Sequence, residues 1–95
     1  MRSYEMVFIV HPDLDGDELD GVIGDVEDLI KRNNGKVTKV EPWGLRKLAY
    51  PIKKQQEGRY SLMEFDLEPQ NVAEMERVLK LMESVIRHLI VRLES

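Results

Sequence analysis

Cysteine is absent from the 95 residues, and histidine occurs only twice. A chain without cysteine forms no disulfide, offers no thiolate nucleophile and lacks the usual ligands of structural zinc sites. His11 and His88 have no further ligands at a metal-binding spacing, so we predict neither a metal site nor a cofactor. The missing cysteine also fits the reducing cytoplasm, where we expect the protein to reside.

Long apolar runs and catalytic motifs are lacking as well. No apolar run approaches the roughly 18 residues of a membrane span, and the N-terminus has no signal-peptide layout, so we expect no membrane partner. No serine has a base at a suggestive spacing. Gly16, Gly21 and Gly24 stand among carboxylates, which repel phosphate and exclude a phosphate-binding loop. We therefore predict no enzymatic activity and no small-molecule substrate.

The charge that is present is segregated by sign, although the net charge is only -4. Residues 36–59 contain seven basic and two acidic side chains, whereas the segments on either side are acidic. A nucleic-acid contact requires a local basic face rather than a basic protein. Lysines also occur on edge strands as a defence against pairing with other sheets, so charge alone leaves both interpretations open.

Alternation of apolar and polar side chains predicts four β-strands, over residues 4–10, 36–52, 59–67 and 85–93. The first strand is apolar on both faces, which indicates a central position. The second is interrupted at residues 42–44, where we expect a bend or bulge. Pro51 lacks an N–H for the ladder and therefore places this strand at a sheet edge.

Two segments have the 3.6-residue period of an amphipathic helix. The first covers about residues 16–33, with Asp15 as the N-cap and Glu18 completing a capping box. Gly21 and Gly24 are expected to allow close approach to the sheet. The second helix begins near Pro69, a favourable first position.

The resulting order is β-α-β-β-α-β in a single domain over residues 1–95. We predict an α+β, ferredoxin-like fold whose four-stranded antiparallel sheet has the order 4-1-3-2, with both helices on one face. Residues 44–60 then form a basic edge hairpin with a turn from Lys53 to Gly58, in which Gly58 takes a positive φ.

The helix-free face of this sheet is predicted to be apolar. Val7, Ile9, Tyr60 and Leu62 lie there, joined by Arg87, Leu89 and Val91 or by the alternate set of the last strand. An apolar strip of this kind serves most simply to bind another chain. RNA-recognition domains share the topology, but only Tyr60 would offer such a domain's base-stacking ring to solvent.

Residues 44–53 read Gly-Leu-Arg-Lys-Leu-Ala-Tyr-Pro-Ile-Lys. This stretch resembles the sixth protein of the bacterial small ribosomal subunit. The likeness extends to residues 1–5, 34–37 and 58–60, and the order of elements agrees along nearly the whole chain. Many members of that family continue into a polar tail that helps to hold a protein partner, whereas this chain stops at Ser95.

The resemblance implies a structural ribosomal protein of the cytoplasm, without catalysis. Family members bind small-subunit ribosomal RNA as a heterodimer with the eighteenth protein of that subunit. By position, the implied RNA-binding residues are Arg2, Arg46, Lys47, Lys53, Lys54, Arg87 and Arg92. The implied partner-binding residues are Val7, Ile9, Tyr60, Leu62 and Leu89.

Two alternatives remain open from the residues alone. One is a self-associating regulatory domain that covers the same sheet face with a second copy. The other is a single-strand RNA-binding domain in which Tyr60 stacks on a base.

Overall fold

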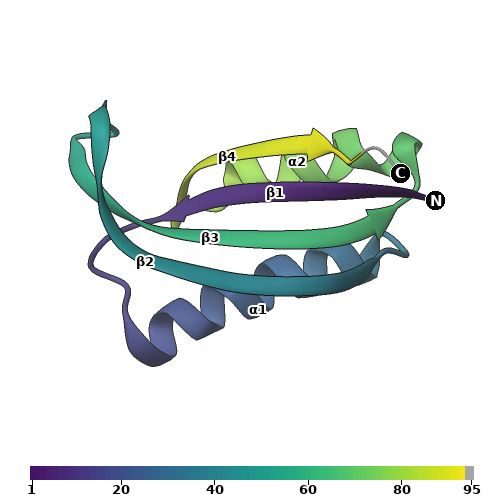
Figure 1. The fold of residues 1–95 in the computed structure, drawn as a ribbon, viewed down its shortest axis with the longest axis horizontal. Helices are drawn as coiled ribbons and strands as arrows, with labels where there is room; N and C mark the ends of the chain where they lie inside the picture. The colour runs from purple at the N-terminus through teal and green to yellow at the C-terminus, as the bar shows by residue number, and fades with distance from the viewer. Residues whose placement is uncertain (94–95) are drawn as a thin grey trace.

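The computed structural model describes residues 1–93, so the last two residues of the predicted domain lie outside the described part. Two helices and four strands alternate in the predicted order (Figure 1). The elements are β1 (Arg2–Val10), α1 (Gly16–Arg32), β2 (Lys36–Ile52), β3 (Gln55–Leu67), α2 (Val72–Leu81) and β4 (Val85–Arg92). A single 3₁₀ turn over Pro69–Asn71 precedes α2.

The four strands form one antiparallel sheet in the order β2-β3-β1-β4. This confirms the ferredoxin-like arrangement expected from the sequence, including the central position of β1 and the edge position of β2. The register of β1 pairs Met6 with Met63 of β3 and with Ile90 of β4. Since paired residues point to the same side of a sheet, this register aligns the apolar sets of three strands.

Both helices pack against that aligned face. Val26 and Ile30 of α1 join Met75 of α2 in one cluster with the buried side chains of the sheet. Phe8 and Phe65 are at most 1% exposed within it. The two helical stripes therefore cover one face of the sheet, and the other face has no helix over it.

The β2–β3 turn differs from the prediction. It contains only Lys53 and Lys54, both with positive φ, and Ile52 pairs directly with Gln55. Positive φ at both central residues is the geometry of a two-residue hairpin turn whose twist matches that of the strands. The predicted six-residue turn is therefore wrong, and β3 begins earlier than expected.

Gly58 has a different role from the predicted one. Its φ is not in the left-handed range. A Cβ at this position would lie 2.2 Å from Cγ2 of Ile9. Gly58 is needed because the side chain of Ile9 on the neighbouring strand β1 lies against its backbone, with no room for another side chain.

Three smaller expectations have mixed outcomes. The pairing of β2 with β3 shifts between Pro42 and Gly44, which confirms the predicted irregularity. Asp15 is the N-cap of α1, but its side chain makes no capping hydrogen bond, so the predicted capping box is absent. Gly21 and Gly24 have open space where a Cβ would lie, and the close approach to the sheet expected at both is wrong.

Candidate functional site

The helix-free face is formed by every second residue of β1, β3 and β4. His88 and Ile90 face the helices, because His88 Nε2 lies 3.2 Å from Oε1 of Glu76 on α2 and Ile90 packs on the core. These contacts decide which residues of β4 face the helices, a question that the sequence left open. Arg87, Leu89 and Val91 lie on the helix-free face, where Leu89 is 59% and Val91 is 51% exposed.

The far end of the β2–β3 hairpin bends over part of this face. Figure 1 shows it turning away from the line of the other strands. Tyr50 of β2 reaches Arg87 of β4, whose Nη1 donates a hydrogen bond of 2.5 Å to the Tyr50 hydroxyl. The guanidinium also lies 5.9 Å from the centre of the Tyr50 ring. These contacts connect the two outermost strands of the sheet at one end.

An apolar groove of about 270 Å³ lies beneath this bend. Its walls come from three strands of the sheet and from the hairpin, and include Val7, Ile9, Leu48, Tyr50, Tyr60 and Leu89. Tyr50 itself is 58% exposed at its rim. The groove is thus apolar inside, and Arg87 supplies a cation at its border.

Two of the five partner-binding candidates are less accessible than the sequence predicted. Ile9 is only 6% and Leu62 only 7% exposed in the isolated chain. The prediction of a fully open face assumed a flat sheet, whereas the bent hairpin covers Ile9 at Gly58. Val7 and Tyr60 are half-buried at the groove, and Leu89 is the most accessible of the five.

The outer part of the helix-free face is charged. Trp43 Nε1 donates a hydrogen bond to Oε1 of Glu41, and Lys39 Nζ lies 3.2 Å from Oε2 of the same carboxylate. The hydrogen bond from Trp43 and then Lys39 lower the pKa of Glu41 below its usual value. Arg46 lies over the Trp43 ring at 5.2 Å. This cluster fixes the ring beside the edge strand.

The structure separates the seven RNA-binding candidates into groups. Arg46 pairs with Gly58 and Lys47 with Glu57, so their side chains leave opposite faces of the edge strand. Lys53 and Lys54 form the hairpin tip. The remaining three do not gather: Arg87 lies near that tip, whereas Arg2 and Arg92 lie at the other end of the sheet, opposite Leu67 and Tyr4 respectively.

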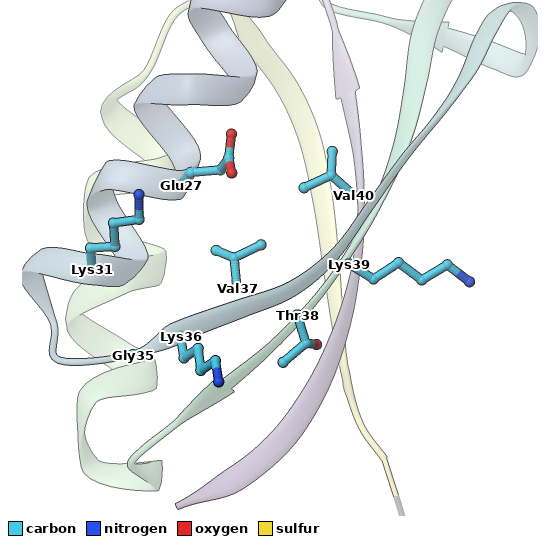
Figure 2. Close-up of a pocket in the computed structure, with 8 residues that line it drawn as sticks. All are labelled: Glu27, Lys31, Gly35, Lys36, Val37, Thr38, Lys39 and Val40. Atoms are coloured by element: carbon cyan, nitrogen blue, oxygen red, sulfur yellow. The ribbon is translucent and has the colours of Figure 1, made fainter.

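Sequence reasoning missed the hollows outside this groove, two of which border β2 or the hairpin tip. The first lies between α1 and the edge strand β2 and holds about 400 Å³. Figure 2 shows Glu27 and Lys31 on α1 with Val37 of β2 pointing toward them, while Lys36 and Lys39 point away from the helix. The second lies where the hairpin tip meets α2 and β4, and its lining includes Lys53, Lys80 and Arg87. No local pattern signals either hollow, because each joins elements distant in sequence.

Over residues 1–93, the structure contains no cluster of three metal-ligating side chains. In the same part of the chain, no helix is both long and apolar enough to cross a membrane.

Comparison with known proteins identifies the family. The model of the family described as "Ribosomal protein S6" matches residues 3–92. The chain belongs to the ribosomal protein S6 family. It is 45% identical to small ribosomal subunit protein bS6 of Moorella thermoacetica, covering all of this chain and 97% of the relative. It is 44% identical to bS6 of Caldanaerobacter subterraneus subsp. tengcongensis, with both chains covered completely.

A solved structure in the S6 family supports the same assignment. The crystal structure of 30S ribosomal protein S6 from Thermotoga maritima superimposes with a TM-score of 0.89 at 35% identity. The match covers 97% of this chain and 87% of that one. As an S6-family member, the chain is a ribosomal protein of the small subunit, located with the ribosome in the cytoplasm, and not an enzyme.

Proposed function

We propose that the chain binds small-subunit ribosomal RNA jointly with the eighteenth protein of that subunit, as a heterodimer. The partner covers the accessible part of the helix-free face, and cations of the hairpin and sheet ends contact the RNA. The observation that carries this proposal is the exposure of Tyr50 and Leu89 at one apolar groove, with Val91 exposed on the same face. Exposed apolar side chains gathered beside a groove are typical of a surface that another chain covers.

The candidate residues of this face differ in how accessible they are to the partner. Leu89 offers the largest accessible apolar surface, and Val7 and Tyr60 are reached through the groove. Ile9 and Leu62 are covered in the isolated chain, so they become contacts only where the hairpin shifts. We expect Leu89 to dominate the binding energy, because accessible apolar anchors that become fully buried have the largest effects when truncated.

The RNA-binding side chains are Arg2, Arg46, Lys47, Lys53, Lys54, Arg87 and Arg92. The chain as a whole has a net charge of -4, so its acidic surfaces oppose the approach of a polyanion. We therefore expect weak RNA binding by the chain alone and tighter, salt-sensitive binding once the partner is present.

Partner binding is tested by a matched pair of substitutions at exposed leucines. Leu89 lies on the helix-free face, whereas Leu81, 68% exposed, lies on α2. Leu89→Asp should weaken the heterodimer at least about tenfold in titration calorimetry, since it places an unpaired charge in an apolar interface. Leu81→Asp should have little effect. Equal effects, or a chain that forms its own dimer at micromolar concentration in sedimentation, would contradict the proposal.

RNA binding is tested with the heterodimer and a transcript of the central domain of the small-subunit ribosomal RNA. Replacing Arg46 and Lys47 by Gln should make the salt dependence of log K shallower by about 1 per lost phosphate contact. The chain alone provides the comparison. If it binds the transcript as well without the partner as with it, the joint mode of binding is wrong.

Tyr60→Ala separates this function from single-strand RNA binding. Tyr60 lines the groove beneath the hairpin, and Phe65, the other nearby ring of β3, is buried against Tyr4 with ring centres 5.7 Å apart. The substitution should therefore reduce affinity for the partner. Abolished RNA binding with unchanged partner affinity would instead indicate base stacking on Tyr60.

A further inference from the structure

A small cleft lies where three elements distant in sequence converge: the β2–β3 turn, the last turn of α2 and the start of β4. It holds about 280 Å³. Lys53 comes from the turn, Lys80 from α2 and Arg87 from β4. The floor is apolar and firmly packed, formed by the buried side chains of Leu79, Val85 and Ile86. Three cations therefore surround a buried, apolar floor.

No ion pair within residues 1–93 neutralises these cations. None of the residues that line the cleft is acidic. The ion pairs formed within residues 1–93 involve neither Lys53 nor Lys80 nor Arg87. Cations that converge without a carboxylate repel one another, and an apolar floor strengthens that repulsion because it lowers the local dielectric constant. An anion in the cleft would relieve it.

Two side chains that line the cleft, Arg87 and His88, make polar contacts with neighbouring residues. The hydroxyl of Tyr50 accepts the hydrogen bond from Arg87, so the guanidinium is oriented without losing its charge. His88 also lines the cleft, and its Nε2 lies 3.2 Å from Oε1 of Glu76. Arg87 is therefore oriented at the cleft, and the carboxylate of Glu76 is paired with His88.

We propose that this cleft binds a phosphodiester group of the ribosomal RNA backbone, with Lys53, Lys80 and Arg87 as its cationic contacts. The inference rests on the proposed RNA-binding function and adds to it a defined subsite. It also adds Lys80, which no sequence pattern indicated. Lys and Arg side chains around a preformed hollow are the groups that contact nucleic-acid phosphates.

The hollow between α1 and β2 is a poorer phosphate site, although it also has lysines. Glu27 stands among the residues that line it, one turn of α1 before Lys31 (Figure 2). A carboxylate at that position repels an anion and offsets one of the lysines. The cleft at the hairpin tip has no such residue in its lining.

Lys80→Gln is the sharpest test, because Lys80 lines the cleft but not the groove assigned to the partner. The matched control is Arg77→Gln, which removes one cation from the same helix, where Arg77 pairs with Glu74 at 2.7 Å. With the heterodimer and the central-domain transcript, Lys80→Gln should weaken binding about fivefold to tenfold and make the salt slope shallower by about 1. Arg77→Gln should change neither quantity appreciably.

Two further measurements separate the subsite from other effects. Lys80→Arg should restore binding, since it returns the charge. Affinity for the protein partner and the melting temperature should be the same for Lys80→Gln as for the unmodified chain. A drop in partner affinity that accounts for the weaker RNA binding would overturn the subsite.

The outcomes also distinguish the two proposals. If the unmodified heterodimer binds the transcript and Lys80→Gln binds equally well with the same salt slope, the subsite is wrong and the function stands. If the unmodified heterodimer fails to bind the transcript at all, the function itself is wrong.

Discussion

The two faces of the sheet are made from the same strands but are completed differently. On the helix-covered face, Phe65 is 1% exposed and stacks on Tyr4 within the chain's own core. On the helix-free face, Leu89 is 59% exposed, and only a bent hairpin covers part of the surface. Alternation along a strand thus produces one apolar surface that the helices bury and a second that stays largely accessible, to which we assign the partner.

This difference implies that substitutions separate into two classes. Changes on the covered face should lower the free energy of unfolding and leave partner affinity intact once the protein is folded. Changes on the helix-free face should lower partner affinity and leave the free energy of unfolding nearly unchanged. The boundary between the classes lies at Ile9 and Leu62, which belong to the helix-free face but are buried in the isolated chain.

The largest effect is expected from comparing Phe65→Ala with Leu89→Ala. Removing the buried ring should lower the free energy of unfolding by about 3–5 kcal/mol, because it leaves a cavity and loses the contact with Tyr4. Leu89→Ala should cost less than about 0.5 kcal/mol, as is usual for exposed positions. Urea denaturation measures both. Similar costs would show that the two faces are not energetically distinct.

Gly58→Ala tests whether the hairpin packs on β1. The new Cβ would meet Cγ2 of Ile9 at 2.2 Å, so the Ile9 side chain or the strand backbone must shift, at a cost of about 1–3 kcal/mol. Combination with Ile9→Ala should recover part of the loss. Gly21→Ala is the control: its Cβ meets nothing within 4 Å, and it should stabilise the helix by about 1 kcal/mol.

Ser61→Ala tests an imperfection on the covered face. The Ser61 hydroxyl is fully buried and is without a hydrogen-bond partner within residues 1–93. Its removal should raise the free energy of unfolding by about 1 kcal/mol, since an unsatisfied buried polar group no longer has to be desolvated. A loss of stability in thermal or urea denaturation would show that the hydroxyl has a role in the core.

The smallest effect is expected from Tyr50→Phe, which removes the hydroxyl that accepts the bond from Arg87 but keeps the ring. Exposed hydrogen bonds contribute little, so stability should fall by about 0.5 kcal/mol. Hydrogen exchange at the hairpin tip should nevertheless become faster. Unchanged exchange would mean that the contact does not hold the hairpin over the open face.

The covered face could be predicted from the sequence because its signals are local. The alternation through Phe65 and the helical period through Val26 each record burial on one side of an element, and the structure buries both residues as expected. The edge position of β2 likewise followed from Pro51 alone, since a proline cannot complete a central ladder.

The hairpin could not be predicted as well, because its geometry depends on distant contacts. Lysine gives no signal for the left-handed backbone, yet Lys53 and Lys54 adopt it. Gly58 did resemble a turn residue, but the reason for it is the side chain of Ile9 on another strand. The cleft with Lys80 depends on the same bend and was therefore invisible in the sequence.

The contact between Tyr50 and Arg87 has one further consequence, for the behaviour of the sheet as a whole. In a flat sheet the outer strands stay far apart, and each remains open to pairing with strands of foreign molecules. Here twist and bending bring β2 and β4 into side-chain contact at one end, so the sheet curves toward closure at that end. Edge-to-edge aggregation should accordingly begin at the unrolled end, where β2 starts and β4 stops.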